Sequence, residues 1–241
     1  MRIPRIFHPE PLQAGTQVTL SDDASHHVGR VLRMQVGQAL ELFTGDDHRF
    51  EAVIQAVSKK SVTVDVIQAH YDARESPLEI HLVQGISKGD RMDFVLQKSV
   101  ELGVTSITPV FTERCNVKLS GERLEKKQDQ WQKIVLGACE QSGRNTVPTV
   151  HPACTLAQWL AKPRAGQALI LDPHANTRFR TIQPAATYTL LIGPEGGFSD
   201  AEVRLLAEHQ CTGVALGPRV LRTETAALAA ITALQSHFGD L

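Results

Sequence analysis

The sequence lacks the residue patterns that usually hold a metal ion. Its four cysteines, Cys115, Cys139, Cys154 and Cys211, include no C-x-x-C pair, so a zinc site is not expected. None of the ten histidines belongs to an H-E-x-x-H motif. The histidines are therefore expected to be surface or hydrogen-bonding residues, and no metal centre is predicted.

Long apolar runs are also missing. No stretch reaches the roughly 18 apolar residues of a membrane span. The first eleven residues, MRIPRIFHPEP, hold three prolines and two arginines and no apolar core, unlike a signal peptide. We therefore expect no membrane association and a cytoplasmic protein with reduced thiols.

Neither sign of charge is in excess. Lys and Arg together number 25 against 26 Asp and Glu, which gives a net charge of −1. A strongly basic nucleic-acid-binding protein is thereby excluded, and any RNA site must come from local clusters of Arg and Lys. The length of 241 residues fits one large domain or two unequal ones.

Residues 1–72 are predicted to form a small β-barrel. Val62, Val64 and Val66 alternate with polar residues, as in a half-buried strand, and turn-forming residues occupy 44–47 and 58–61. A short helix is expected near residue 22, capped by Ser21 or Asp22. Its predicted apolar face comprises Ala24, Val28, Val31 and Leu32.

After the polar segment 71–77 the pattern changes to alternating strands and helices. Apolar strands are predicted at 78–83, 107–111, 168–171, 189–192 and 214–216. Helices are predicted around 92–103 and over 120–142, and two more follow the last two strands. This alternation indicates an α/β domain with a mostly parallel sheet, assigned to residues 73–241.

Three glycine- or proline-containing loops follow the last three strands, at 171–174, 193–197 and 217–225. Open parallel sheets bind ligands beyond the carboxyl ends of their strands, and glycine lets a ligand approach the backbone. None of the loops is a phosphate-binding or dinucleotide-binding fingerprint. The pattern therefore favours a nucleotide-like ligand over ATP or NAD. Ser199 and Glu202 form a capping box, so Ser199 is not expected to be a nucleophile.

Five segments together resemble a known family: HHVGRVLRM (26–34), KGDRMDFVLQKSVELGV (88–104), CEQSGR (139–144), LLIGPEGGFSDAE (190–202) and LGPRVLRTETAAL (216–228). They are similar to the bacterial methyltransferases that modify N3 of a uridine in 16S ribosomal RNA, which belong to the SPOUT class. The resemblance covers nearly the whole chain, in order. It implies a trefoil-knotted C-terminal domain, a PUA-like N-terminal barrel that helps bind RNA, S-adenosylmethionine in the three loops, and a homodimer.

The resemblance and the loop positions together give a set of candidate residues. The predicted catalytic residues are Arg222, Glu195 and Glu224. The predicted cofactor-binding residues are Leu171, Ile192, Gly193, Pro194, Gly196, Gly197, Leu216, Gly217, Leu221, Thr223 and Ala226. The predicted RNA-binding residues are Arg5, Arg30, Arg33, Lys88 and Arg144, because arginine pairs bidentately with phosphate.

Methylation of N3 requires the loss of a weakly acidic proton, so a fixed positive charge near the uracil oxygens would help. Arg222 is the candidate for that charge. Glu195 or Glu224 could take the proton, and either could equally hold a loop in place. Arg222 could instead pair with one of these carboxylates and only shape its loop. Two other functions stay open: a non-catalytic RNA-binding protein of the same fold, and an α/β enzyme acting on a small nucleotide. The alanine-rich segment from Ala226 is expected to contribute to a dimer contact; the alternative is that it packs within the chain against the sheet.

Overall fold

A computed structural model describes residues 3–241, and the chain divides into two compact units. The first comprises the residues up to Glu75 together with Cys139–Val147, and the second comprises Ser76–Ala138 and Pro148–Leu241. The segment Cys139–Val147 is distant in sequence from the rest of the first unit. The sequence-based range 1–72 did not include it.

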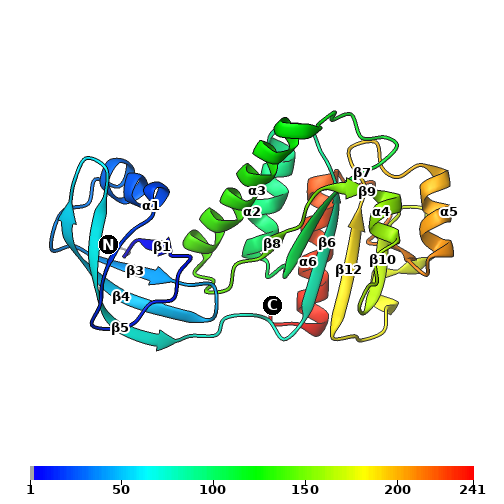
Figure 1. The fold of residues 1–241 in the computed structure, drawn as a ribbon. Coiled ribbons are helices and arrows are strands. Elements are labelled where there is room, and N and C mark those ends of the chain that lie inside the picture. Colours follow the sequence, from blue (N-terminus) through cyan, green and yellow to red (C-terminus); the bar gives the residue numbers. More distant parts are fainter. Residues whose placement is uncertain (1–2) are drawn as a thin grey trace. The chain divides into compact units, whose positions relative to one another are not determined.

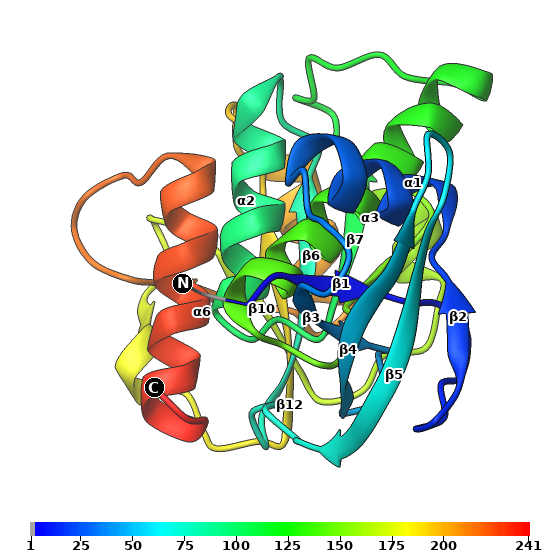
Figure 2. The ribbon, with the colours of Figure 1, turned by 90° about the vertical axis from the view of Figure 1, so that its left-hand side faces the viewer.

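The first unit is built on a mixed sheet (Figure 2). Its strands are β1 (Arg5–Phe7), β2 (Gln17–Thr19), β3 (Ala39–Phe43), β4 (His48–Val57) and β5 (Val62–Tyr71). They lie in the order β1-β3-β4-β5-β2, and only β1 and β3 pair in parallel. Val62, Val64 and Val66 are fully buried on one face, which confirms the predicted alternation.

A short helix, α1 (Asp22–His26), begins where the sequence predicted, and the Ser21 hydroxyl accepts a hydrogen bond from the backbone of Ala24. It continues directly into a π-helical turn, η1 (His27–Val31). The wider turn shifts the side chains that follow. Val28 is buried, but Val31 and Leu32 are 58% and 40% exposed. The predicted apolar face was therefore wrong at these last two positions.

The second unit contains a parallel sheet in the order β11-β13-β10-β12-β6-β7-β8, with β9 also pairing with β7. Every pairing in it is parallel. The strands are β6 (Glu79–Gly85), β7 (Ser106–Phe111), β8 (Thr149–Val150), β9 (Cys154–Thr155), β10 (Gln167–Leu171), β11 (Thr177–Arg178), β12 (Thr187–Ile192) and β13 (Thr212–Ala215). The predicted α/β class and parallel sheet are confirmed.

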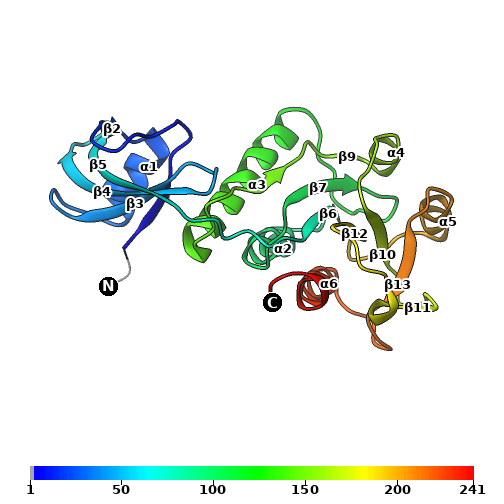
Figure 3. The same cartoon turned by 90° about the horizontal axis from the view of Figure 1, so that it is seen from below.

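Helices cover both faces of this sheet (Figures 1 and 3). They are α2 (Asp90–Glu101), α3 (Gly121–Ser142), α4 (Leu156–Leu160), α5 (Asp200–Glu208) and α6 (Thr223–Phe238), with a 3-10 turn at Phe179–Thr181. Side chains of α4 and α5 pack with Val83, Ile170 and Leu191 in one core cluster. On the other face α6 packs against α2, β6 and β12. Parallel sheets need such cover because both faces are apolar.

The connection from β13 to α6 positions the candidate site. In the sheet, β10 and β12 separate β13 from β6, yet α6 packs over β6 and β12. Residues 216–222 must therefore cross the carboxyl ends of the central strands. The three loops predicted to bind a ligand meet at this crossing.

Candidate active site

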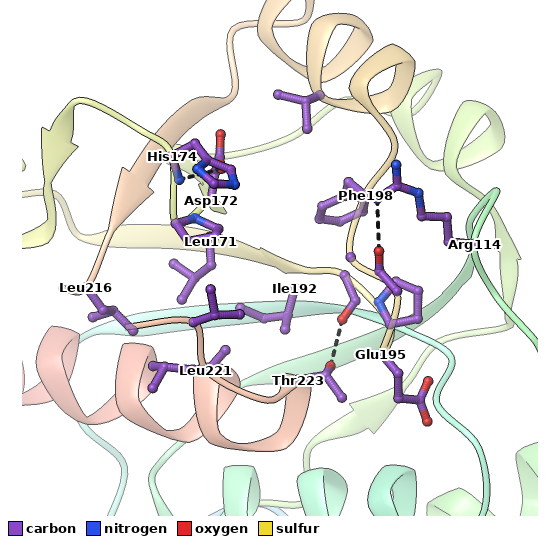
Figure 4. Close-up of a pocket in the computed structure, with 18 of the residues that line it drawn as sticks. Arg114, Leu171, Asp172, His174, Ile192, Glu195, Phe198, Leu216, Leu221 and Thr223 are labelled. Atoms are coloured by element: carbon purple, nitrogen blue, oxygen red, sulfur yellow. Dashed lines mark hydrogen bonds between the residues drawn. The ribbon is translucent and has the colours of Figure 1, made fainter. Parts of the chain in front are cut away.

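A cavity of about 660 Å³ lies at the carboxyl ends of β10, β12 and β13 (Figure 4). Residues from all three predicted loops form its wall. All eleven residues predicted to bind the cofactor line it: Leu171, Ile192, Gly193, Pro194, Gly196, Gly197, Leu216, Gly217, Leu221, Thr223 and Ala226. The volume is in the range of small-molecule sites, about 300–1,000 Å³.

The cavity combines an apolar floor with a polar margin. Leu171, Ile192, Leu216 and Leu221 point into it from the strand ends and from the crossing loop (Figure 4). Backbone groups of the glycine loop 193–197 and several charged side chains surround this floor. The apolar floor of such a site can pack against a flat ring, and the backbone groups at its margin can form hydrogen bonds with the polar atoms at the edge of that ring.

Gly193 is required by close contact between backbones. A Cβ atom at this position would lie 2.9 Å from the carbonyl carbon of Gly197 and 2.9 Å from the amide nitrogen of Phe198. Real Cβ contacts essentially never come so close to backbone, so any larger residue must displace the loop. The turn is closed by a hydrogen bond from Gly197 N–H to Pro194 O (2.8 Å).

The segment that follows this loop is fixed by a capping box at the start of α5. Ser199 accepts from the Glu202 amide, and the Glu202 carboxylate accepts from the Ser199 amide. Glu202 also accepts from the amide of Glu113 (2.8 Å). Ser199 therefore has the capping role predicted from the sequence.

Glu195 lies at the cavity wall but is held by other groups. Its Oε1 accepts from the amide of Lys88 (2.9 Å) and from the Arg91 guanidinium (2.9 Å). Burial opposes ionisation, but these hydrogen bonds, one from its own amide and the Arg91 charge hold the pKa of Glu195 below its ordinary value. A carboxylate stabilised in this way is a weak proton acceptor.

The other two predicted catalytic residues lie at the start of α6. Arg222 is its N-cap and is exposed, and its backbone carbonyl accepts from Ala226 N–H (2.8 Å). Leu221 and Thr223 line the cavity, whereas Arg222 does not. Over residues 3–241, no carboxylate pairs with the Arg222 guanidinium. Glu224 has a buried Oε2 atom without a hydrogen-bond partner in the same part of the chain. Pairing of Arg222 with either glutamate, the alternative raised above, is thus not observed.

Sequence reasoning missed several charged residues of the cavity wall. Arg114 lines it and donates to the carbonyl of Gly196 (3.1 Å). Arg114 follows β7, and the loop after that strand has no glycine to draw attention to it. Asp172 and His174 also line the cavity. They belong to a loop that the sequence did indicate, but no spacing distinguished them.

Two predicted RNA-binding residues form ion pairs and hydrogen bonds within the first unit. The Arg144 guanidinium pairs with Glu75, and its side chain is 8% exposed. Arg5 pairs with Glu41 (2.9 Å) and donates to the side chain of Asn145 (2.5 Å). These buried pairs hold the segment Cys139–Val147 to the rest of its unit. Arg5 and Arg144 therefore have structural partners within this unit, and their contact with RNA stays a prediction.

The other predicted RNA contacts, Arg30, Arg33 and Lys88, are exposed. Arg30 borders a hollow of about 400 Å³ between α1, η1 and the β4–β5 turn, and its guanidinium donates to Lys59 O (3.3 Å). Lys59 and Lys60 border the same hollow. They occupy the turn at 58–61, which the sequence analysis recognised without considering its charge.

Comparisons with known proteins agree with this architecture. Residues 74–235 match the model of an RNA methyltransferase domain, and residues 20–67 match that of an RNA methyltransferase PUA domain. The ribosomal RNA small subunit methyltransferase E of Buchnera aphidicola is 38% identical, over 100% of this chain and 98% of that protein. This chain belongs to the ribosomal RNA small subunit methyltransferase E family.

Solved structures support the same assignment. A putative methyltransferase from Legionella pneumophila, in complex with the bound cofactor SAM, has a TM-score of 0.97 and 48% identity, and the match covers 100% of both chains. The family member from Neisseria gonorrhoeae, bound to S-adenosyl methionine, has a TM-score of 0.92 and 41% identity over 100% of both chains. The predicted family, the PUA-like and SPOUT fold and the rRNA methyltransferase activity are confirmed.

Residues 3–241 contain neither a metal-binding group nor a membrane-spanning helix. No three His, Cys, Asp or Glu side chains in this range are grouped to hold a metal ion. No helix in it has the length and apolar character needed to cross a membrane.

Proposed function

We propose that this methyltransferase uses S-adenosylmethionine to methylate N3 of a uridine in 16S ribosomal RNA. The observation that carries the proposal is the single cavity formed by all eleven predicted cofactor residues. The apolar floor suits an adenine ring, and the backbone of loop 193–197 suits its edge. Carboxylates at the wall, Asp172 and Glu195, suit a cationic ligand.

We assign a separate role to each of the two domains predicted from the sequence. Residues 73–241 would bind the cofactor and perform the reaction, and residues 1–72 would contribute affinity for RNA. We also propose that the protein acts in the cytoplasm, where its substrate is assembled.

The apolar side chains of α6 that were predicted to contact a partner are largely used within the chain. Ala227, Ala230, Ile231 and Leu234 are fully buried there.

When bound, S-adenosylmethionine supplies a methyl group carried on a sulfonium centre. The N3–C bond forms as the S–C bond breaks, and the N3 proton must leave. The exposed Arg222 guanidinium is free to approach the uracil oxygens and stabilise the negative charge that develops on them. Of the two proposed proton acceptors, Glu195 is already held by Arg91 and Lys88, which leaves Glu224 as the better candidate.

The proposal is tested by incubating the protein with labelled S-adenosylmethionine and small ribosomal subunits, and mapping the label. Label on N3 of one uridine is the expected result. A protein that binds subunits without transferring label would be a non-catalytic RNA-binding protein of this fold. Label on free nucleotides only would indicate a small-nucleotide enzyme.

Replacing both Arg30 and Arg33 with alanine is expected to weaken binding to the small subunit. Each lost phosphate contact lowers the slope of log affinity against log salt by about 1, so the double variant should lose about 2. Affinity for S-adenosylmethionine should not change. Replacing Lys59 and Lys60, which border the same hollow, with alanine should lower the affinity for the small subunit and its salt dependence in the same way. The matched control replaces Arg123 and Lys126, two exposed cations of α3. An equal slope change in that control would show that the effect is one of total charge.

We propose a homodimer, as the family resemblance implied, with the partly exposed side chains of α6 at the contact. Leu228, Ala229 and Ala233 retain partial exposure and are available for it. Light scattering at micromolar concentration should report about twice the mass of one chain. A chain mass that stays monomeric up to that concentration would contradict the dimer.

A further inference from the structure

A buried chain of hydrogen bonds connects the end of β6 to the cofactor loop and to the start of α6. It begins at Gln84, whose side chain is fully buried behind the cavity. Its Nε2 donates to Gly85 O (3.0 Å) and to Thr223 Oγ1 (2.9 Å). Thr223 Oγ1 in turn donates to Gly193 O (2.6 Å). Gly193 and Thr223 line the cavity, whereas Gln84 does not.

The direction of every bond in this chain is determined. Gly193 O can only accept, so the single hydroxyl hydrogen of Thr223 must point to it. Thr223 Oγ1 must then accept from Gln84, which must present its NH₂ group on that side. A side chain that offered only an acceptor to Thr223 Oγ1 could not complete this chain of hydrogen bonds.

Gly85 brings the same two segments together by steric contact. A Cβ atom on Gly85 would lie 2.5 Å from the nitrogen of Pro194 and 2.9 Å from the carbonyl carbon of Gly193. The 193–194 peptide bond therefore rests directly on the end of β6. It is held there on one side by this contact and on the other by the Thr223 hydroxyl.

Packing alone does not account for Gln84. Its Oε1 is buried and has no hydrogen-bond partner within residues 3–241. An unpaired buried acceptor is destabilising, and an apolar side chain of similar size would avoid that cost. The benefit of glutamine at this site is the donated bond to Thr223.

We infer that Gln84 is a positioning residue for methyl transfer. Through Thr223 it sets the distance between the cofactor loop at Gly193 and the first turn of α6. Arg222 immediately precedes that turn. The cofactor wall and the proposed catalytic guanidinium are thereby held at a fixed position relative to each other. This inference rests on the proposed function, because it assigns a role to Gln84 in the same reaction.

The test compares paired variants at both ends of the bond. Thr223→Val keeps the shape of the side chain but removes the hydroxyl, so Gly193 O loses its bond to Thr223 and Gln84 Nε2 keeps only its bond to Gly85 O. It should weaken S-adenosylmethionine binding about tenfold and slow single-turnover methylation about tenfold. Thr223→Ser keeps the hydroxyl and should recover most of both losses.

The second pair tests the direction of the bond. Gln84→Glu replaces the amide donor with a carboxyl group, which in its ionised form can only accept. In that form Thr223 cannot satisfy both neighbours, and both readouts should fall as for Thr223→Val. Gln84→Met removes the donor without adding an acceptor, leaves the Thr223–Gly193 bond in place, and should have the smaller effect. Thermal unfolding of each variant identifies any that are not folded, and the serine–valine comparison then decides the question.

Three outcomes are distinguishable. If Thr223→Val binds cofactor and methylates at the wild-type rate, the positioning role is overturned while the proposed function stands. If the wild-type protein neither binds S-adenosylmethionine nor methylates subunits, the proposed function itself fails. A loss in Thr223→Val that Thr223→Ser does not share supports the role of the hydroxyl.

Discussion

Replacing Arg222 with alanine is expected to slow single-turnover methylation of small subunits about 10²–10³-fold when cofactor and RNA are both saturating. This is the usual cost of removing one group that stabilises charge developing in a transition state. Arg222 is exposed and pairs with no carboxylate in the described part of the chain, so its charge is available to substrate. A contact made mainly in the transition state lowers kcat, whereas uniform binding contacts raise KM.

Two comparisons sharpen this prediction. Arg222→Lys should recover only part of the rate, since lysine keeps the charge but loses the planar guanidinium. Cofactor affinity, measured by calorimetry, should remain close to wild type because Arg222 does not line the cavity. An alanine variant that turns over at the wild-type rate would leave Arg222 only its role as the N-cap of α6.

Gly193→Ala is expected to abolish most cofactor binding and to reduce the rate about a hundredfold. The added methyl group would lie 2.9 Å from backbone atoms of both Gly197 and Phe198, and these cannot move aside as a flexible side chain would. The loop must shift, and small displacements in a reaction site can cost about 10² in rate. Calorimetry with S-adenosylmethionine and a single-turnover assay measure the two effects.

The matched control for this change is Gly137→Ala. Gly137 lies within α3, and a Cβ atom there would meet nothing within 4 Å. Alanine favours helix over glycine, so the control should be at least as stable as the wild type. Wild-type affinity in Gly193→Ala would mean that the loop does not form the cofactor wall.

The sequence was most informative where patterns are periodic and local. The strands of the parallel sheet and the long helices α2, α3 and α6 were predicted because their apolar residues recur at regular spacing. The two-residue strands β8, β9 and β11 carry no such pattern and were not predicted. Val31 and Leu32 fit a helical face, but the π-helical turn that ends at Val31 changes the spacing and leaves both exposed.

The candidate site was predicted where glycine marks a loop and missed where the decisive neighbour is distant in sequence. All eleven cofactor positions meet in one cavity, because the carboxyl ends of adjacent parallel strands share an edge. Arg144 was predicted to contact phosphate, because nothing in its neighbouring sequence indicates that its guanidinium pairs with Glu75. Gln84 was overlooked for the same reason: its partner Thr223 is 139 residues away.

The long helix α3 begins in the second unit, and its last residues, from Cys139, belong to the first. The two units are therefore not modules that can be exchanged by a single cut near residue 75. A gene fusion made there would carry Cys139–Val147 away from Arg5 and Glu75, its partners in the first unit. Recombination of this PUA-like unit onto another enzyme would need three junctions, one of them inside the continuous helix α3, which constrains how such a family could gain or lose its PUA-like part.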